Sequence, residues 1–301
     1  IGRTEVLYDA AVLLKNNGHA IRSILTAKEA PEYSRTANDF KSLAEELNIP
    51  FAQGAKIMDH MEFLDSSGAE IGVSVNYPGI IPQSLIDIFP LGILNAHGGD
   101  LPRYRGNACQ AWAILNGEDR IGLCVHKMIG GELDNGNIIA RDHLNIDHNT
   151  KVTRCWEWII ERTPPLFLQA VDQLERDPQY VMERQPKEPA KALRCYPRRP
   201  EDGRINWDQG ALQILRLINA SNKPYDGAFC EYAGGKMIIW EAEIFPEIEP
   251  FCALPGQVMH LEESHADIAT SDGVLRIKVA QFGDQTGAPM KWIKSIRSRL
   301  Q

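Results

Sequence analysis

Two side chains that could act together on a carbonyl group, Asn95 and His97, stand two residues apart. In an extended chain such residues point to the same side, so both can face one cavity. Acyl transfer to an amine needs a donor for the developing oxyanion and an acceptor for the amine proton, and an amide and an imidazole suit these roles. A nearby carboxylate would fix the imidazole tautomer and favour its protonated form, a part that we give to Asp134. The three residues together predict a catalytic centre.

Each of these residues also has an ordinary structural explanation. Asn95 could occupy a turn, His97 could be a hydrogen-bonded loop histidine, and Asp134 could begin a turn before Asn135-Gly136. The sequence around Asn95 and His97 favours catalysis, because polar residues and glycines directly follow an apolar segment. Such residues would add no stability to a core strand. A metal hydrolase using His97, Asp100 and His126 is a further alternative, although their spacing follows no zinc motif.

Composition limits the class of protein. The chain has 301 residues, of which 44% are hydrophobic and 24% charged, as in soluble proteins with one large and one smaller domain. No apolar run is long enough to span a membrane and residues 1–5 do not resemble a secretory signal, so we expect a cytoplasmic protein without membrane contact. Six cysteines without a C-x-x-C pair are expected to be reduced packing residues. The net charge of −8 disfavours nucleic acid as a partner.

The first half of the chain should build an α/β fold that positions the trio. Helical periodicity covers residues 5–16, 38–47, 82–89 and 108–115, and strands are expected at 21–25, 71–75, 91–94, 122–128 and 137–146. This alternation predicts a mostly parallel sheet with helices on both faces. Such a sheet normally opens with a strand, so we expect a leading strand mostly before residue 1. Strand 91–94 would deliver Asn95 and His97 to its carboxyl end, where ligands bind in open sheets of this kind.

The second half is expected to form a separate, β-rich domain. A helix over 150–176 should be interrupted by Pro164-Pro165, and residues 185–189 read as a proline-bearing linker. These features predict a catalytic domain over 1–185 and a second domain over 200–301. The latter should contain a helix over 209–220 and strands around 227–232, 237–243, 256–260 and 274–279.

Residues 70–145 resemble the formyltransferases that use 10-formyltetrahydrofolate. The resemblance rests on Asn95-x-His97 with a form of the family's S-L-L-P-x-Y-R-G run after it, on Asn116-Gly117-Glu118, on residues 122–128 and on Leu133-Asp134-x-Gly136-x-Ile138. It implies a Rossmann-like domain followed by a small OB-like domain, with 10-formyltetrahydrofolate as cosubstrate and no metal. It also implies that Asn95 and His97 act on the formyl group, while Asp134 holds and polarises His97.

The same resemblance places the folate between two loops. The pterin ring would meet backbone groups of one loop, Gly79, Ile80 and Ile81, and of a second loop, Ile129, Gly130, Gly131 and Leu133. A simple turn at Pro78-Gly79 explains the first loop equally well. The chain departs from the usual family pattern at Gly99-Asp100 and at Asn107, and the segment before Asp134 is one residue longer.

Three branches of the family differ in the amine that they formylate. Glycinamide ribonucleotide formyltransferases are normally single-domain proteins, so the second domain argues against this branch. Residues 198–207 and 224–229 resemble the C-terminal region shared by methionyl-tRNA formyltransferases and sugar-nucleotide N-formyltransferases. Residues 196–301 carry 12 Lys and Arg against 14 Asp and Glu, whereas a tRNA-binding domain should be basic. We therefore favour a nucleotide-linked amino sugar, as in O-antigen or polysaccharide biosynthesis, with the tRNA enzyme as the alternative.

A formyltetrahydrofolate hydrolase, in which water replaces the amine, is a second alternative, although it would carry a regulatory domain ahead of the catalytic one. For a sugar nucleotide, the expected contacts are Arg3, Arg103, Tyr104, Arg105 and Tyr225, each of which could instead be a surface ion-pair or packing residue. A charged terminal helix over 291–299 is expected to be a solvated face rather than a tRNA contact. The sequence leaves the sugar, its nucleotide and the oligomeric state open, and a homodimer is kept as an alternative.

Overall fold

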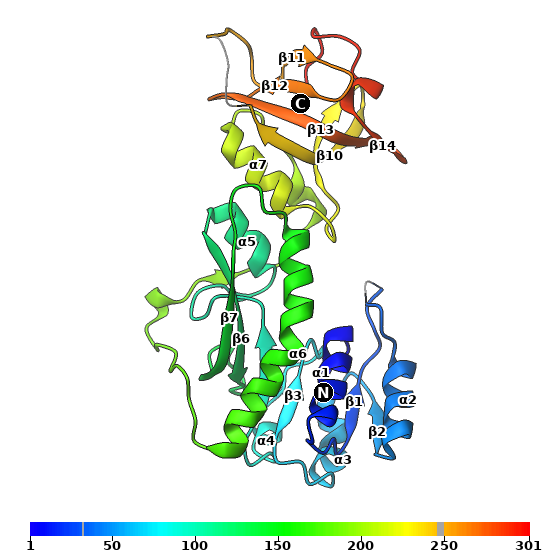
Figure 1. Cartoon of the computed structure of the whole chain (residues 1–301), viewed down its shortest axis with the longest axis vertical. Coiled ribbons are helices and arrows are strands. Elements are labelled where there is room, and N and C mark those ends of the chain that lie inside the picture. Colours follow the sequence, from blue (N-terminus) through cyan, green and yellow to red (C-terminus); the bar gives the residue numbers. More distant parts are fainter. Residues whose placement is uncertain (32, 246–249) are drawn as a thin grey trace. The chain divides into compact units, whose positions relative to one another are not determined.

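The computed structural model describes residues 1–31, 33–245 and 250–301. The chain divides into two compact units, each built from three segments (Figure 1). The first unit comprises residues 1–106, 122–143 and 157–194, and the second comprises 107–121, 144–156 and 195–301. The sequential domain limits 1–185 and 200–301 stay a prediction. In the described part of the chain, no helix is both long and apolar enough to cross a membrane.

The central sheet of the first unit has the strand order β3-β4-β6-β7. Its strands are β3 (Gly72–Ser74), β4 (Ile93–His97), β6 (Arg120–Lys127) and β7 (Ile138–Asn145). β3 and β4 pair in parallel, while β4 and β6 are antiparallel. Ile93 and Leu94 of β4 are fully buried, which holds the strand rigidly up to the polar residues at its end. The predicted α/β class with a parallel sheet is confirmed, with β6 reversing direction next to the site.

A parallel pair of short strands, β1 (Ile24–Thr26) and β2 (Phe51–Gln53), lies beside this sheet. Gly2 connects the two, because it forms isolated parallel bridges with Thr26 on one side and with Val75 on the other. A side chain is excluded at Gly2, since its Cβ would lie 2.0 Å from the Val75 carbonyl oxygen. The leading strand expected before residue 1 stays a prediction.

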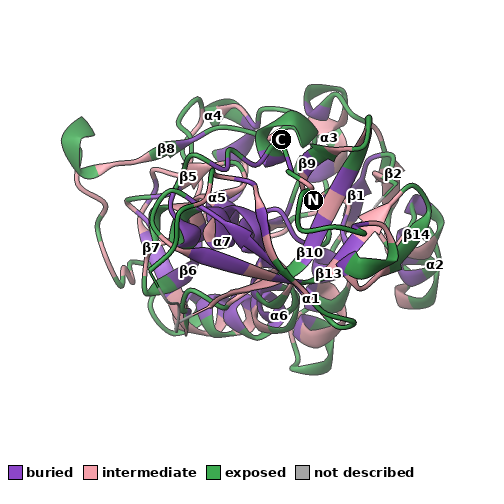
Figure 2. Ribbon diagram, turned by 90° about the horizontal axis from the view of Figure 1, so that it is seen from above, coloured by how far each residue is buried: buried purple, intermediate pink, exposed green. Residues whose placement is uncertain are grey.

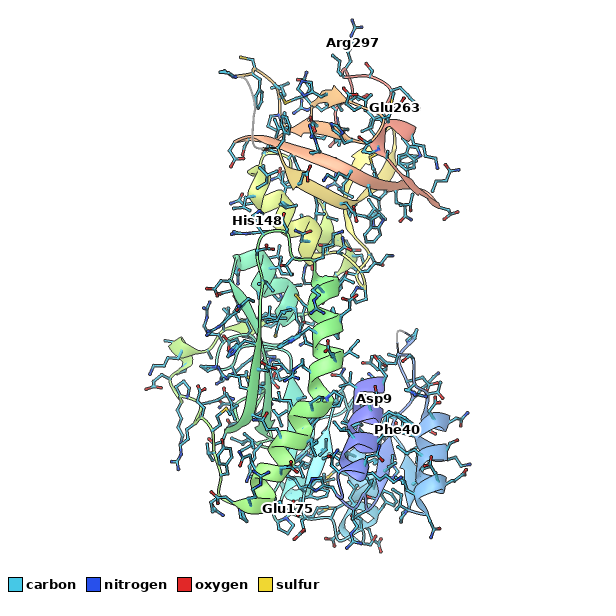
Figure 3. All side chains as sticks on the ribbon, viewed as in Figure 1. Asp9, Phe40, His148, Glu175, Glu263 and Arg297 are labelled. Carbon is cyan, nitrogen blue, oxygen red and sulfur yellow. The ribbon has the colours of Figure 1, made fainter. Side chains whose placement is uncertain are left out.

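Helices of the first unit pack through amphipathic faces. α1 (Glu5–Asn16) has the predicted bounds, and the Thr4 hydroxyl caps it by accepting a hydrogen bond from the Leu7 N–H at 3.2 Å. α2 (Ala37–Leu47) carries the buried Phe40 on the side toward α1 (Figure 3). The Phe40 ring packs edge-to-face with Tyr8 of α1, with ring centroids 5.7 Å apart.

Several helices and strands begin or end at other residues than predicted. The strand expected over 21–25 begins only at Ile24, and the helix expected over 82–89 shortens to α4 (Gln83–Ile86). The strand expected over 91–94 continues to His97, so Asn95 and His97 are the last polar residues of the strand itself. The remaining short elements of this part of the chain are η1 (Ile57–His60), α3 (Met61–Asp65), β5 (Arg105–Gly106), η2 (Pro189–Lys191) and β8 (Arg194–Cys195).

The expected interruption of the long helix at Pro164-Pro165 was wrong. α6 (Val152–Arg176) continues through both prolines. Prolines at these positions leave the carbonyls of Ile160 and Glu161 without helical donors, and both residues are exposed, so water can satisfy them. The Thr163 hydroxyl meanwhile donates to the Ile159 carbonyl at 2.7 Å. The helix therefore tolerates two prolines because the lost hydrogen bonds face solvent.

The second unit contains α5 (Cys109–Asn116), α7 (Ala211–Ala220) and an antiparallel sheet in the order β11-β12-β13-β10-β9, with β14 paired to β13. The strands are β9 (Ala228–Tyr232), β10 (Gly235–Ile244), β11 (Val258–Leu261), β12 (Ala266–Ala269), β13 (Val274–Phe282) and β14 (Gln285–Gly287). Ile214 and Ile218 of α7 join the apolar core of this sheet. Buried residues concentrate on the strands and on α7, and exposed residues on the loops (Figure 2). The predicted β-rich second part is confirmed; β12 and β14 were not predicted.

The charged terminal helix expected over 291–299 is absent from this described segment. A short helical turn, η3 (Pro200–Gly203), lies before α7. Near the end of the described chain the only helical turn is η4 (Pro289–Lys291). Beyond it the backbone pairs with the sheet region: the Leu300 N–H donates to the Gly256 carbonyl at 2.8 Å, and Gln301 exchanges two hydrogen bonds with Glu231. Burial of the Leu300 side chain stabilises this extended course over a helix.

Candidate active site

β4 places Asn95 and His97 at the carboxyl end of a buried parallel strand. Asn95 is paired with Ser74 of β3 on one side and lies opposite His126 of β6 on the other. His97 is buried, with a side chain only 9% exposed. The loop between β6 and β7 then brings Asp134 to the same place. The three residues predicted as the trio are therefore together in one unit, at the sheet edge expected for a ligand site.

The His97 imidazole is held at both nitrogens. Its Nε2 lies 2.6 Å from the backbone carbonyl oxygen of Tyr104, and its Nδ1 lies 3.4 Å from a carboxylate oxygen of Asp134. Burial lowers the pKa of His97 below its usual value of 6.5, although the Asp134 charge and the Tyr104 carbonyl oppose this effect. The lowered pKa favours the neutral imidazole, and because the Tyr104 carbonyl can only accept, its proton lies on Nε2 and the nitrogen able to accept a proton is Nδ1, which faces Asp134.

Gly99 makes the contact between His97 and the following loop sterically feasible. A Cβ at this position would lie 2.1 Å from the Tyr104 carbonyl oxygen and 2.5 Å from the His97 Nε2. Any other residue would push the loop away from the ring. The departure from the family pattern at Gly99 thus has a local structural reason.

Asp134 joins three partners through one carboxylate. Besides His97, it lies 3.5 Å from the Nε2 of His126 and accepts a hydrogen bond from the Gly106 N–H at 3.0 Å. Burial alone would raise the pKa of Asp134, but the charges and hydrogen bonds of His97, His126 and Gly106 outweigh it and lower the pKa to about 2. Asp134 is therefore ionised throughout the physiological range, and its backbone adopts a left-handed conformation with φ of 47°.

His126 is a site residue that the sequence-based prediction of the trio missed. Its Nδ1 lies 3.1 Å from the Lys127 carbonyl, which can only accept, so this nitrogen carries a proton. Its Nε2 lies 3.4 Å from the Asn95 side-chain nitrogen and 3.5 Å from the Asp134 carboxylate, so it can accept from the amide or, when it carries a proton, donate to the carboxylate. A histidine that interrupts a buried apolar strand opposite Asn95 was the available signal, but it becomes meaningful only once the register of β4 and β6 is known.

The three residues predicted around Arg103 have different environments. Tyr104 is buried, at 3% exposure, which favours the packing alternative for its ring over stacking on a sugar. The Arg103 guanidinium lies over that ring at 5.3 Å from its centroid. Arg105 reaches inward: it donates to the Gln185 side-chain oxygen at 2.8 Å, and burial lowers its pKa, opposed by Asp134 and Glu132. Arg105 is therefore the arginine of this loop that belongs to the site.

Arg3 binds the loops that follow β1 and β3. Its Nε donates to the Asn76 carbonyl at 3.2 Å and its Nη1 to the Lys28 carbonyl at 2.9 Å, and the residue is half-buried. Tyr225 belongs to the second unit, and burial raises the pKa of its phenol. Substrate contacts by Arg3 and Tyr225 stay predictions.

The second of the two loops predicted to hold the pterin ring contacts the start of α4, two residues after the first loop. The Gly130 N–H donates to the Gln83 side-chain oxygen at 2.8 Å, and a Cβ at Gly130 would lie 2.2 Å from the Gln83 backbone nitrogen. Ile81 of the first loop is buried, whereas Ile80 is 83% exposed. Ile129 and Leu133 of the second loop are each 39% exposed. Exposed apolar side chains beside exposed backbone groups can take a flat heterocycle.

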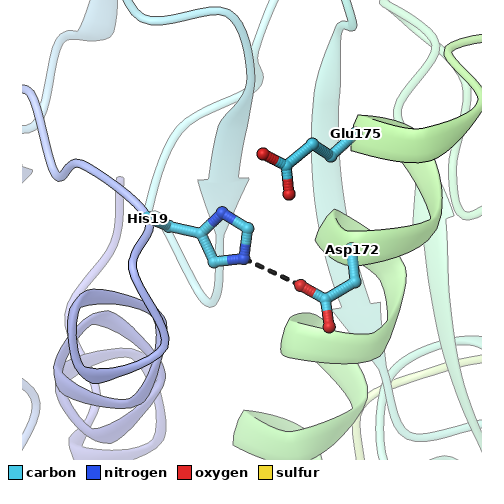
Figure 4. Close-up of side chains that lie close together, drawn as sticks. All are labelled: His19, Asp172 and Glu175. Atoms are coloured by element: carbon cyan, nitrogen blue, oxygen red, sulfur yellow. Dashed lines mark hydrogen bonds and ion pairs between the residues drawn. The ribbon is translucent and has the colours of Figure 1, made fainter.

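The metal alternative is not supported by the arrangement of its residues. Asp100 binds Arg141 at 3.0 Å and His143 at 3.1 Å instead of joining His97 and His126. Among the described residues, the one group spaced to hold a metal ion is His19, Asp172 and Glu175. There, the His19 Nε2 pairs with Asp172 at 2.9 Å (Figure 4), and this ion pair fastens the segment after α1 to α6.

A cavity of about 850 Å³ lies elsewhere in the first unit, lined by Leu14, Ile24, Phe40 and Val73 among others. Its lining includes residues 20–24 and 69–73, which precede or begin β1 and β3, whereas the trio lies at the carboxyl end of β4. The cavity is also lined by His19 and Glu175, but not by Asn95, His97 or Asp134. The cavity is therefore distinct from the candidate active site.

Comparison with known families fits this geometry. A family model described as formyl transferase matches residues 6–171, and one described as formyl transferase, C-terminal domain, matches residues 198–297. The chain belongs to the formyl transferase family. Its reaction is accordingly the transfer of a formyl group, and the first of the two matches contains Asn95, His97 and Asp134.

Individual relatives agree on the family but differ in what they act on. The chain is 29% identical over 278 residues to a methionyl-tRNA formyltransferase of Clostridium tetani, covering 90% of this chain and 86% of the relative. It has the fold of WlaRD, a sugar 3N-formyl transferase solved with dTDP and 5-N-formyl-THF, with a TM-score of 0.67, 18% identity and coverage of 94% and 96%.

HypX from Aquifex aeolicus, solved in complex with tetrahydrofolic acid, also shares the fold, with a TM-score of 0.60 and 19% identity. The match covers 92% of this chain but only 47% of HypX, so the chain spans about half the length of that protein.

Proposed function

We propose that the protein transfers the formyl group of 10-formyltetrahydrofolate to the amino group of a nucleotide-linked amino sugar. The observation that carries this proposal is a buried, neutral His97 between an ionised Asp134 and the Tyr104 carbonyl, on the same strand as Asn95. This arrangement provides a proton acceptor and an amide donor on one side of a strand, at the edge of the sheet where substrates bind.

The reaction requires one bond to form and one to break. The amine nitrogen attacks the formyl carbon, the bond from that carbon to N10 of the folate breaks, and one proton passes from the amine to N10. The cosubstrate supplies the activated formyl group. His97 accepts the amine proton at Nδ1, where the charge of Asp134 stabilises the resulting imidazolium, and the Asn95 amide donates to the formyl oxygen as negative charge develops there.

The residues around the two loops fit a folate. Ile80, Ile129 and Leu133 offer apolar surface, and glycines at positions 79, 130 and 131 let backbone groups approach a ring closely. The hydrogen bond from Gly130 to Gln83 fastens the second loop to the start of α4, which directly follows the first loop. Tetrahydrofolate and 5-N-formyl-THF in two proteins of the same fold support the assignment of a folate cosubstrate.

The acceptor is assigned from charge and from the arginines near the site. Acidic residues outnumber basic ones in residues 196–301, which argues against a tRNA-binding surface. The match to WlaRD, which covers nearly all of both chains, supports a sugar nucleotide as the acceptor. The candidate ligands of the diphosphate are Arg3, Arg103 and Arg105, because one guanidinium group can donate to two phosphate oxygens at once.

Methionyl-tRNA formyltransferase is the second candidate, favoured by the 29% identity to the Clostridium tetani enzyme. The two acceptors are distinguished by salt: binding of tRNA should weaken steeply as salt rises, whereas binding of a sugar nucleotide should change little.

The deciding experiment measures formyl transfer from 10-formyltetrahydrofolate to charged initiator tRNA and to a panel of UDP-, dTDP- and GDP-linked amino sugars. Formylation of at least one amino sugar, and not of tRNA, is the expected result. Activity on tRNA alone would overturn the assignment of an amino sugar as the acceptor. Release of formate without formylation of any acceptor would indicate the hydrolase instead.

A further inference from the structure

The segment after α6 reaches back to the loop that carries Asp134. Ile138, the first residue of β7, donates its N–H to the Glu183 carbonyl at 2.9 Å, and the Met182 N–H donates to the Ile138 carbonyl at 3.0 Å. This antiparallel bridge fixes the chain only two residues before Gln185. A residue that is 51 positions away from Asp134 in sequence is thereby brought beside it.

The Gln185 side chain uses its whole amide in hydrogen bonds. Its Nε2 donates to the backbone carbonyls of Asp134 at 2.9 Å and of Gly136 at 2.8 Å, and its Oε1 accepts from Arg105 at 2.8 Å. The orientation of the amide follows from the partners, because the two carbonyls can only accept and the guanidinium can only donate. No other side chain of similar length offers two donors and an acceptor in one plane.

Both partners of Gln185 need support. Asp134 has a left-handed backbone, and its carboxylate must reach His97 and His126 at 3.4 and 3.5 Å, so a small rotation of its peptide groups would break both contacts. Arg105 has a buried Nε with no hydrogen-bond partner among the described residues. Because the other groups around it leave this donor unsatisfied, the hydrogen bond to Gln185 helps to orient the guanidinium.

We propose that Gln185 is a positioning residue that couples the carboxylate behind His97 to the arginine that binds the acceptor's anionic group. This inference rests on the proposed function. Gln185 fixes the peptide groups on both sides of the Asp134 turn, so that the carboxylate stays aligned with the imidazole. Through its oxygen it also fixes the guanidinium of Arg105, the candidate ligand of the acceptor's phosphate.

Two substitutions separate these two actions. Gln185→Glu keeps an acceptor for Arg105 but removes the donors to the Asp134 and Gly136 carbonyls, so kcat should fall roughly 10- to 100-fold with little change in KM for the acceptor. Gln185→Ala removes all three hydrogen bonds, so kcat should fall similarly and KM should rise as well. Gln179→Ala is the matched control, because this exposed glutamine lies in the same segment and away from the site.

A second measurement needs no substrate. The His97 ring faces Asp134, His126 and Arg105, and its titration can be followed by NMR in the wild type and the three variants. Misplacement of the carboxylate in Gln185→Ala, which adds no charge of its own, should shift the midpoint by about half a pH unit or more, and Gln179→Ala should leave it unchanged.

The outcomes distinguish this inference from the proposed function. Shifted titrations in a protein that formylates none of the acceptors would sink the proposed function and leave the positioning of Asp134 standing. An active wild type whose Gln185 variants keep kcat within twofold, or lose kcat without any shift in the His97 titration, would overturn the role of Gln185.

Discussion

The single buried carboxylate of Asp134 contacts His97, His126 and the Gly106 N–H. The carboxylate is held ionised by these partners. Its effect on the reaction would be exerted through His97, whose imidazolium form it stabilises.

Removal of this charge should therefore lower the rate of formyl transfer strongly. Asp134→Asn keeps the size of the side chain but removes its charge, so kcat for formyl transfer should fall by roughly 10²- to 10⁴-fold. Asp65→Asn, at an exposed position in α3, should leave kcat unchanged. Steady-state kinetics of the two variants give the comparison, and an Asp134→Asn enzyme within threefold of the wild type would contradict the assigned part.

The protonation of His97 sets the expected pH dependence of the rate. Because burial lowers the pKa of His97 below 6.5, the base is lost only as pH falls through that lowered value. The profile of kcat/KM should be flat above pH 6.5 and decline at lower pH. A rate independent of pH between about 5 and 8, or a decline that begins well above pH 6.5, would argue against His97 as the base.

At the scale of elements, α6 shows how a helix accommodates two prolines. Pro164 is buried and Pro165 exposed, and the carbonyls left without N–H donors belong to exposed residues. Solvation limits the cost of the missing hydrogen bonds but does not remove it.

Pro165→Ala should consequently stabilise the protein, by about 1–2 kcal/mol, since the new N–H can bond to the Glu161 carbonyl while part of the gain is lost to a freer unfolded chain. Pro178→Ala, at an exposed site just beyond α6, should be neutral or slightly destabilising. Urea denaturation measures both variants, and a destabilised Pro165→Ala protein would show that the proline sets a bend that packing requires.

At the scale of the whole molecule, the buried site should make stability depend on pH. Because the pKa of His97 is lowered by folding, the unfolded chain binds more protons just below pH 6.5, and the free energy of unfolding must fall as pH drops from 6.5. Asp134 acts in a different range: its contribution, about 2 kcal/mol for a pKa lowered from 3.8 to about 2, is present above pH 3.8 and disappears only as pH falls through about 2.

The contribution of His97 can be measured by urea denaturation between pH 5 and 7.5, where Asp134 stays ionised in the folded protein. Wild-type protein should lose stability toward pH 5, His97→Gln should show a shallower slope, and His148→Gln, at an exposed position, should keep the wild-type slope. Only the slopes are compared, so a lower overall stability of the His97 variant does not disturb the test. Equal slopes in all three proteins would show that His97 is not the group that titrates.

The sequence alone determined what local chemistry can encode. The bounds of α1 follow from its apolar spacing and its Thr4 cap, and Asn95 and His97 were recognisable because polar residues two apart end an apolar strand. The long helix was predicted with an interruption because periodicity does not tell which carbonyls face water. Short strands such as β12 gave too little pattern to be predicted.

Only the tertiary structure brought together residues whose roles depend on pairing across the sheet. His126 meets Asn95 because β4 and β6 are antiparallel in one register, and Gln185 reaches Asp134 because the segment after α6 bridges to β7. The lowered pKa of His97 likewise depends on burial that no single segment supplies. Residue types and local spacing are written in the sequence, whereas strand register, burial and the fields that shift a pKa arise only when distant segments pack together.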